Sequence, residues 1–393
     1  MIAPTSFFSD YGGHIRILEE TRALQARGVQ VAIVTYYKGN DVPGLDIRRT
    51  APLPWHTDYE VGSSRHKIAF DVYLAMKAAA EARRFRPDVV HGHMHEGALI
   101  GGALARAIGV PLVFDFQGSL TAEMVDHHFL NPQGALYPWA YRLETAITRR
   151  LPHAILTSTG LAATLLRDEF GVPAARIHTL PDCADADHFD PARFAHLQTD
   201  HPLRVHYGIA RDAVVVGYLG LLTDYQGIPH LIEAAARLKE QGQSIHFLIM
   251  GYPNVESYQM AAHAWGVDDC VTFTGRVPFA DAPTYLAACD IAVAPKMSSS
   301  EGSGKLLNYM AMAQPIVAYD TPVNREYLDD LGVYAPPGDV AAFTAAIAEL
   351  AGDAARRRAL GAALRRRAQE EFSWPVAAER IANLYNRLTN KVD

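Results

Sequence analysis

The sequence predicts an α/β protein built from two doubly wound parallel sheets. Short, continuously apolar segments alternate with helical stretches along most of the 393 residues, which is the pattern of strands covered by helices on both sheet faces. The intervening segments are long enough for right-handed crossovers. A chain of this length also exceeds what one hydrophobic core usually holds, so we expect two domains, each with its own sheet.

The apolar runs define the expected strands. Residues 1–4 read as the end of a buried strand, and each later strand is a short apolar run bounded by turn residues or a helical stretch. In the first half we expect strands at residues 29–36, 89–91, 111–116 and 154–158. In the second half we expect them at residues 214–219, 246–251, 271–274, 291–294 and 315–319.

A composition shift separates the two sheets. Residues 180–191 are rich in Asp and Pro, and the residues that follow, to about His206, are polar and rich in histidine. Such a stretch suits a linker. We therefore place the first domain at residues 1–195 and the second at residues 196–370.

Charge, cysteine content and hydropathy restrict the functional class. The net charge of −7 argues against general affinity for nucleic acid. Cys183, Cys270 and Cys289 are widely spaced and odd in number, which fits reduced thiols better than a disulfide framework or a zinc site. The longest apolar stretch, residues 98–116, contains Arg106 and does not suit a membrane span. We expect a cytoplasmic protein without a signal peptide.

The basic residues gather in clusters at residues 83–86, 149–150, 356–358 and 365–367. Clusters of this kind are usually solvated helix faces. For the first two, contact with an anionic membrane surface or a phosphorylated acceptor is the alternative. Peripheral contact with the inner face of the membrane therefore stays open.

Residues 301–318 are the most informative segment, because a glycine turn opens an amphipathic helix directly behind an apolar strand. Free N–H groups and the helix dipole favour an anion at such a helix start. Gly302 and Gly304 let the backbone approach a phosphate closely, and Lys305 adds a positive charge. The alternative is an ordinary strand, turn and helix of an α/β sheet.

Histidines are dense at the expected strand end near residue 91. A metal site is conceivable, since His93 and His95 alternate beside Glu96, but no second cluster completes a ligand shell. We prefer a role in acceptor binding, because ligands collect at the carboxyl ends of strands in open α/β sheets. For His91, packing beneath the next helix is the simpler interpretation. Residues 65–67 could bind an acceptor phosphate or cap a loop.

Five segments, in order, resemble the motifs of the GT-B glycosyltransferases, and within that group the retaining enzymes of family 4. They are a glycine loop with its helix, an acceptor-domain strand, an interdomain crossover, a donor-site helix and a C-terminal helix. The segments lie at residues 10–29, 87–93, 180–191, 301–318 and 372–388.

The resemblance implies a GT-B fold, in which two Rossmann-like domains face each other across a cleft and residues 371–393 form a helix that returns to the first domain. It implies a retaining, metal-independent enzyme that moves a sugar from a nucleotide-sugar donor to a hydroxyl of a glycan, lipid-linked or small-molecule acceptor. No cofactor is expected, because the nucleotide sugar is a substrate.

The family motifs also imply roles for residues of this chain. Those implied in catalysis are Glu301, Lys305, Gln117 and His93. Those implied in donor binding are Gly12, Gly13, Lys296, Ser303, Gly304, Leu306, Asn308, Gly275 and Arg276. Those implied on the acceptor side are His14, His95, Glu96, Arg65 and Lys67. No residue is assigned as a metal ligand.

The sequence departs from the family at the turn that normally carries an Arg and a Lys against the donor diphosphate. Leu221 and Gln226 stand at those places. Removing a preorganised hydrogen-bond donor that stabilises a charged leaving group typically costs a few kcal/mol. Another cation should therefore compensate. Lys296 and Lys305 are the best candidates, with Arg65 or Lys67 in reserve.

Two further departures affect the sugar and ribose contacts. Asn308 replaces the second of a glutamate pair and stands seven residues after Glu301 instead of eight. Its amide can still donate to and accept from ribose hydroxyls. Gln117 stands where the family commonly has a histidine beside the sugar, and an amide cannot shuttle protons.

These departures leave three alternatives. An activated sugar with a different phosphate geometry would keep the enzyme class. A non-catalytic binding or partner subunit would keep the fold without the chemistry. A GT-B epimerase is disfavoured by the family-4-like donor helix and by the Phe-Ser-Trp at residues 372–374.

Overall fold

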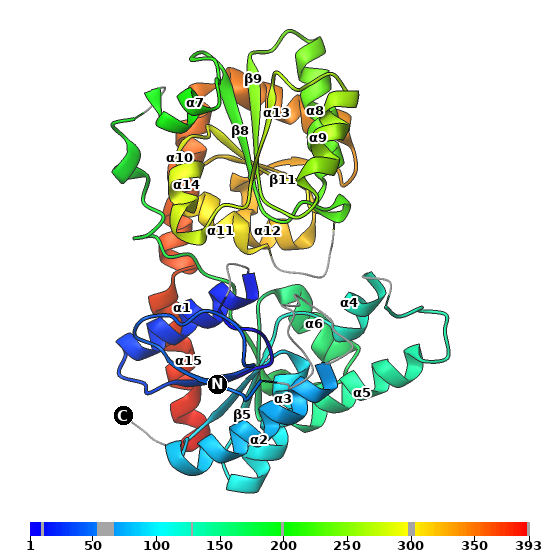
Figure 1. Cartoon of the computed structure of the whole chain (residues 1–393), viewed down its shortest axis with the longest axis vertical. Helices are drawn as coiled ribbons and strands as arrows, with labels where there is room; N and C mark the ends of the chain where they lie inside the picture. The colour runs from blue at the N-terminus through cyan, green and yellow to red at the C-terminus, as the bar shows by residue number, and fades with distance from the viewer. Residues whose placement is uncertain (9–11, 53–66, 127–128, 198–199, 298–302, 391–393) are drawn as a thin grey trace. The chain divides into compact units, whose positions relative to one another are not determined.

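The computed structural model describes residues 1–8, 12–52, 67–126, 129–197, 200–297 and 303–390. It divides into two compact units (Figure 1). Unit 1 comprises Met1–Pro181 together with Trp374–Asp393, and unit 2 comprises Asp182–Ser373. The first boundary between the units therefore falls after Pro181, whereas composition led us to expect it after residue 195. Residues 182–195, which we assigned to the first domain, belong to unit 2.

Unit 1 contains a seven-stranded, wholly parallel sheet in the order β3-β2-β1-β4-β5-β6-β7. The central strands are buried along their whole length, which is why their sequences are continuously apolar apart from a few polar positions. The strands are β1 (Ile2–Ala3), β2 (Ala32–Thr35), β3 (Asp46–Arg49), β4 (Val90–His93), β5 (Leu112–Phe116), β6 (Ala154–Thr157) and β7 (Ile177–Thr179).

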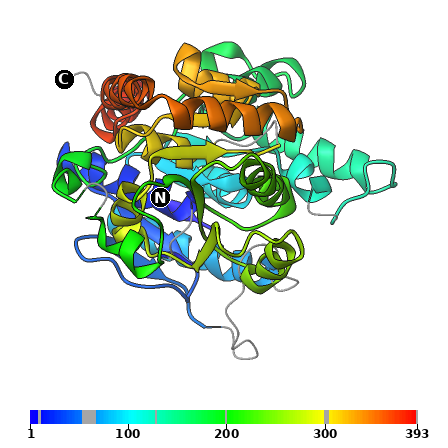
Figure 2. The ribbon, with the colours of Figure 1, turned by 90° about the horizontal axis from the view of Figure 1, so that it is seen from above.

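The helices of unit 1 cover both faces of this sheet. They are α1 (Gly12–Ala26), α2 (Lys67–Phe85), α3 (Met94–Ile108), α4 (Leu120–Asp126), α5 (Tyr137–Arg150), α6 (Gly160–Asp168) and α15 (Trp374–Thr389). The connection through α1 leads from β1 to β2, toward the β3 edge of the sheet. The connections through α2, α3, α5 and α6 lead toward the β7 edge. Right-handed crossovers therefore place α1 on one face and the latter helices on the opposite face. The terminal helix α15 packs against α1 (Figures 1 and 2).

Unit 2 contains a six-stranded parallel sheet in the order β10-β9-β8-β11-β12-β13. Its strands are β8 (Val214–Leu219), β9 (Ile245–Met250), β10 (Val271–Gly275), β11 (Ile291–Ala294), β12 (Ile316–Tyr319) and β13 (Val333–Ala335). Its helices are α7 (Pro202–His206), α8 (Ile228–Glu240), α9 (Val255–Ala264), α10 (Ala282–Ala287), α11 (Gly304–Ala311), α12 (Pro322–Leu328), α13 (Val340–Gly352) and α14 (Ala354–Glu371). One apolar core joins α8 and α13 to the sheet.

Within the described residues, no helix combines the length and the apolar character that crossing a bilayer requires.

Helix α14 approaches the chain at the end of α11 so closely that only glycine fits at position 361. A Cβ atom there would lie 1.9 Å from the carbonyl oxygen of Ala313. We expect Gly361→Ala to lower the free energy of unfolding by about 1–3 kcal/mol, because the backbone must shift to admit the methyl group. Thermal unfolding would measure the loss. Gly352→Ala is the matched control, since no atom lies within 4 Å of its Cβ position. An equal effect of the two substitutions would contradict the packing argument.

Candidate functional site

The carboxyl ends of the parallel strands carry the polar residues of each unit, as expected for ligand sites in open α/β sheets. In unit 2 these ends lead into the turn at residues 220–227, which follows β8, and into helix α11, which follows β11. In unit 1 they lead into α1, α3 and the segment after β5.

Lys305 lies in the first turn of α11, and its side chain returns to the turn after β8. Its Nζ atom donates to Gln226 Oε1 at 2.6 Å and to Tyr218 Oη at 3.0 Å. The ammonium group also lies 4.3 Å from the centre of the Tyr218 ring, whose face attracts a cation. Gln226 occupies the place at which the resemblance expects a lysine, so Lys305 brings a positive charge to that place from the helix.

Gly220 leaves room for this ammonium group. A Cβ atom at position 220 would lie 2.9 Å from Lys305 Nζ. The second candidate cation, Lys296, is buried just beyond the end of β11. Both lysines that could compensate for the altered turn therefore belong to the carboxyl-end edge of this sheet.

Two hydroxyl groups near the carboxyl ends of the unit 2 strands have no hydrogen-bond partner among the described residues. They are Thr223 Oγ1, in the turn, and Ser303 Oγ, directly before α11. Buried polar groups are nearly always hydrogen-bonded, so the partner of each hydroxyl is not among the described residues. The N-terminus of α11 adds a positive dipole end, which favours an anion.

The remaining donor-binding candidates of unit 2 are arranged as follows. Gly275 ends β10 in a left-handed conformation, with φ of 74°, which favours glycine. The Arg276 guanidinium lies 5.3 Å from the centre of the Tyr252 ring. Leu306 is fully buried, whereas Asn308 is partly exposed. Glu301 lies outside the described residues.

The glycine loop of unit 1 opens α1, which begins at Gly12. A Cβ atom at Gly13 would lie 3.2 Å from Gln117 Oε1, so the loop backbone and the Gln117 amide are neighbours. His14 is buried, and its Nε2 atom pairs with Thr5 Oγ1. The structure therefore brings Gly13 and Gln117 together, while His14 contacts residues of its own segment.

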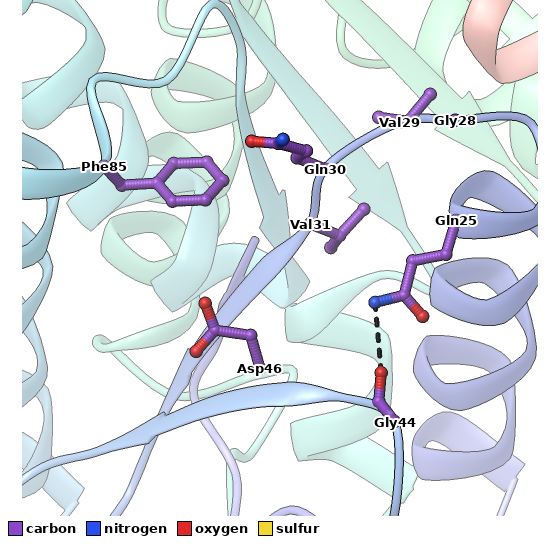
Figure 3. A pocket seen from close by; sticks show the side chains of 8 residues that line it. All are labelled: Gln25, Gly28, Val29, Gln30, Val31, Gly44, Asp46 and Phe85. Atoms are coloured by element: carbon purple, nitrogen blue, oxygen red, sulfur yellow. Dashed lines mark hydrogen bonds between the residues drawn. The ribbon is translucent and has the colours of Figure 1, made fainter.

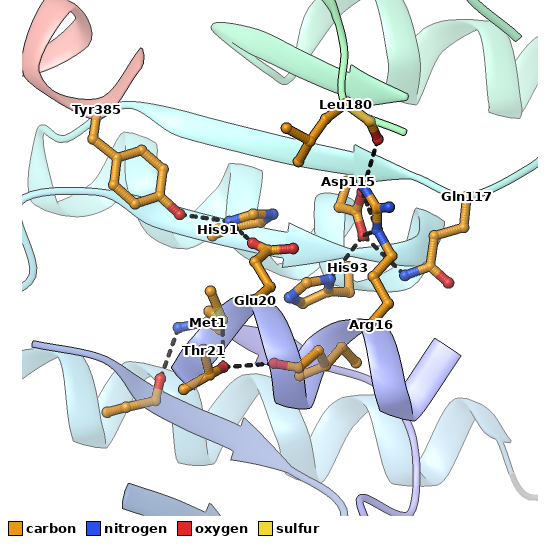
Figure 4. Close-up of polar contacts among 12 residues, drawn as sticks. Met1, Arg16, Glu20, Thr21, His91, His93, Asp115, Gln117, Leu180 and Tyr385 are labelled. Carbon is orange, nitrogen blue, oxygen red and sulfur yellow. Dashed lines mark hydrogen bonds and ion pairs between the residues drawn. The ribbon is translucent and has the colours of Figure 1, made fainter. Parts of the chain in front are cut away.

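Asp115, near the carboxyl end of β5, organises the polar interior of unit 1 (Figure 4). Arg16 donates to both of its carboxylate oxygens, at 2.9 to 3.2 Å. Gln117 Nε2 donates to Oδ2 at 2.9 Å, and His93 Nδ1 lies 3.0 Å from the same oxygen. The strand register pairs His93 directly with Asp115. All but Gln117 are buried.

The charge state of this group follows from its contacts. Burial alone would raise the pKa of Asp115, but the Arg16 guanidinium holds it well below its usual range. Burial lowers the pKa of His93, against the effect of Asp115. A neutral His93 therefore donates its Nδ1 proton to an ionised Asp115, and its Nε2 atom, which has no partner among the described residues, keeps a lone pair.

Glu20, His91 and His93 form a second buried group beside the first (Figure 4). One potential ligand atom from each lies within 4.8 Å of the others. The two imidazole rings are stacked, however, with their planes 16° apart. Their in-plane lone pairs therefore run side by side, whereas a shared metal ion needs them to converge.

The second group has a simpler electrostatic interpretation. Burial raises the pKa of Glu20 to about 8, and the nearby Asp115 carboxylate adds to the effect. The carboxyl group is thus protonated at neutral pH. Burial also lowers the pKa of His91, whose Nδ1 atom lies 2.6 Å from Tyr385 Oη.

The acceptor-side candidates have partners within unit 1. His95 is buried, with Nε2 lying 3.2 Å from Glu144 and its ring edge-on to Phe114 and Phe116. Glu96 forms an ion pair of 3.0 Å with Lys67. Arg65 lies outside the described residues. Of these candidates, Glu96 and Lys67 retain partial exposure, whereas His95 is largely part of the packing beneath α3.

A pocket in unit 1 lies at the amino ends of the strands, opposite the candidate site (Figure 3). It is lined by residues such as Gln30, Asp46 and Phe85, which precede β2, begin β3 and end α2. These positions mark the amino ends of the strands. Ligands of open α/β sheets bind at the carboxyl ends, so this pocket is not the functional site.

Comparison with known proteins identifies the two units. Residues 12–183 match the model described as "Glycosyl transferase 4-like domain", and residues 213–353 match "Glycosyl transferases group 1". Sucrose-phosphate synthase from Thermosynechococcus elongatus has the same fold, with a TM-score of 0.81 and 18% identity over 100% of this chain and 98% of that one.

Two relatives cover nearly the whole chain. The 2-deoxystreptamine glucosyltransferase of Streptomyces kanamyceticus is 26% identical over 402 residues, spanning 96% of this chain and 99% of its own. The D-inositol 3-phosphate glycosyltransferase of Kribbella flavida is 24% identical over 407 residues, spanning 97% and 92%.

Two Rossmann-like units with parallel sheets and these neighbours define a protein of the GT-B class. The chain belongs to the glycosyltransferases that combine a 4-like domain with a group 1 domain, and it is an enzyme that transfers a sugar from a nucleotide-sugar donor. The fold, the family and the class of activity predicted from the sequence are confirmed.

Proposed function

We propose that the chain is a retaining, metal-independent glycosyltransferase, with the donor bound by unit 2 and the acceptor by unit 1. The acceptor is a hydroxyl of a glycan, a lipid-linked sugar or a small molecule. The observation that supports this proposal most directly is Lys305, whose Nζ atom is held against Gln226 and Tyr218. It supplies a cation where the altered turn has lost one.

The donor diphosphate is proposed to bind over the N-terminus of α11. The N–H groups of residues 303–305 and the hydroxyls of Thr223 and Ser303 donate to its oxygens, and Lys305 neutralises its charge. Asn308 then serves the ribose, the backbone near Gly275 the base, and Glu301 the sugar hydroxyls. Lys296 is a second source of positive charge at the same edge.

The proposed reaction proceeds on one face of the sugar. The acceptor oxygen bonds to the anomeric carbon as the bond from that carbon to the phosphate oxygen breaks. The acceptor proton passes to the leaving phosphate oxygen, and a nucleoside diphosphate departs. No protein base is required, so the main contribution of the enzyme is electrostatic support of the leaving phosphate and alignment of the two substrates.

The acceptor is proposed to approach the carboxyl ends of β4 and β5. Gln117, whose amide donates to Asp115, is the partly exposed polar group there, whereas His93 is fully buried and acts only through its contact with Asp115. The names of the relatives suggest the first acceptors to try, because 2-deoxystreptamine and inositol 3-phosphate are both polyhydroxylated six-membered rings.

We also propose that unit 1 contacts a membrane surface peripherally. Arg83, Arg84, Arg149 and Arg150 are all exposed. Exposed basic residues gain energy near anionic headgroups.

Thermal-shift titration with UDP, GDP, ADP, dTDP and CMP tests the donor assignment. A nucleotide at 100 times its dissociation constant should stabilise the native state by about 2.7 kcal/mol. We expect one nucleotide to act selectively, and we expect Asn308→Ala to abolish the shift, because the ribose loses its partner. Asn383→Ala, at an exposed position of α15, is the matched control. The absence of a shift with every nucleotide would favour the unusual activated donor and contradict this proposal.

A further inference from the structure

Two neighbouring helices of unit 1 expose apolar side chains at helical spacing. Helix α2 exposes Ile68, Val72 and Met76, one on each successive turn. Leu136, Trp139 and Leu143 do the same at the start of α5, and Trp139 is 72% exposed. Residues three or four apart share one side of a helix. Each helix therefore carries an exposed apolar stripe. The stripe of α2 lies opposite the buried residues of that helix, whereas the stripe of α5 borders the buried Ile147, four residues after Leu143.

Helix α3 lies between the two helices that carry these stripes. It packs against both α2 and α5, and the three helices cover the same sheet face (Figure 1). Leu99 of α3 is also 48% exposed. Residues 129–136, directly before α5, project from unit 1 in both views (Figures 1 and 2). We call the outward side of these helices the α2–α3–α5 face.

The α2–α3–α5 face is basic in a chain that is acidic overall. The three helices contain eight Lys and Arg residues and four Asp and Glu residues, whereas the whole chain carries a net charge of −7. Each of the four acidic side chains already has a partner inside unit 1. The pairs are Asp71 with Tyr36, Glu81 with Arg48 and Lys77, Glu96 with Lys67, and Glu144 with His95.

We infer that the α2–α3–α5 face docks on an anionic lipid surface. Apolar side chains, among them an exposed tryptophan, enter the headgroup region, while arginines beside them contact anionic headgroups. Arg142, Arg149 and Arg150 are exposed on α5 itself. The inference deepens the membrane contact proposed above by naming the surface and the lipid charge that it requires.

Charge also argues against a second copy of this chain as the occupant. Two α2–α3–α5 faces in contact would oppose like charges, which costs free energy at an interface. An anionic bilayer offers the complementary charge together with an apolar interior. A lipid surface therefore complements both the apolar side chains and the positive charge of the face, whereas a second copy of the chain complements only the apolar side chains.

Co-sedimentation of the full chain with vesicles tests the inference without using enzyme activity. We expect binding to phosphatidylcholine vesicles that contain phosphatidylglycerol, and little binding to phosphatidylcholine alone. Replacing Leu136, Trp139 and Leu143 together with serine should reduce the partition coefficient by about tenfold or more, because these side chains no longer enter the lipid. Arg142→Glu with Arg150→Glu should reduce it by a similar factor, and raised salt should weaken binding of the unaltered chain.

Matched controls come from unit 2. Met260→Ser with Trp265→Ser removes two exposed apolar side chains, and Arg358→Glu with Arg366→Glu reverses two exposed charges of α14. Neither pair should change vesicle binding.

Three outcomes would overturn the inference. They are no binding to the anionic vesicles, equal losses in the control variants, and a dimer in sedimentation equilibrium that the α5 variants disrupt. The last would assign the face to self-association. None of them affects the nucleotide titration, so failure here is distinguishable from failure of the transferase proposal.

Discussion

Lys305→Ala is expected to lower kcat by about a hundredfold or more. The donor diphosphate gains charge as the sugar leaves, and the turn at residues 220–227 has no Arg or Lys side chain to balance it. Removing one preorganised group at such a position typically costs a factor of this size. Steady-state kinetics with the donor identified by thermal shift would measure the effect. The melting temperature should fall only modestly, because Lys305 is not part of the apolar core.

Lys239→Ala is the matched control for this experiment. Lys239 belongs to the same unit and forms an exposed ion pair with Asp269, so its loss should leave kcat unchanged. A Lys305→Gln variant separates charge from volume, since its amide fills similar space without a charge. Full activity of Lys305→Ala or Lys305→Gln would remove Lys305 from the proposed mechanism and leave Lys296 as the remaining candidate.

Asp115→Ala is expected to lower the free energy of unfolding by about 3–5 kcal/mol. The substitution leaves the buried Arg16 guanidinium without its counter-charge, and breaking a buried pair by removing one partner is strongly destabilising. His93 and Gln117 lose their acceptor at the same time. Differential scanning calorimetry would show a large fall in the melting temperature of unit 1.

Asp320→Ala provides the comparison. Its ion pair with Arg325 has similar geometry, with contacts of 2.7 and 2.8 Å, but both side chains are more than 40% exposed. Exposed pairs contribute about 1 kcal/mol at most. If Asp320→Ala and Asp115→Ala destabilised the protein equally, burial would not be the source of the effect.

The strands of both sheets could be predicted largely from their apolar runs, and those missed lie at sheet edges. Strand β3, with the sequence Asp-Ile-Arg-Arg, lies at a sheet edge. Its Arg48 is satisfied by Asp46 and Glu81. Strand β7, with the sequence Ile-His-Thr, is a short edge strand as well. Strand β13, Val-Tyr-Ala, is an apolar edge strand, and its three residues are too few to stand out as a run. An edge strand has one neighbour and one solvent-facing side, so its sequence need not be apolar.

In the candidate site, local motifs predicted some residues and missed others. Local motifs predicted the helix start at Lys305 and the glycine loop at Gly13, because both depend on neighbours in sequence. Arg16, Glu20 and Tyr385 were missed, since their partners lie far away along the chain and only the fold brings them together. Asp115 did leave a signal, because an acidic residue inside a continuously apolar strand is rarely buried without a partner.

The division of the chain has a consequence for its synthesis. Unit 2 is one uninterrupted segment, Asp182–Ser373, whereas unit 1 is closed by Trp374–Asp393. Domains commonly fold in order from the N-terminus as they emerge from the ribosome. Here the first unit to be translated lacks α15, and with it the Tyr385 hydroxyl beside His91, until the residues that follow unit 2 have emerged. All helices and strands of unit 2 have therefore been synthesised before α15, the helix that completes unit 1.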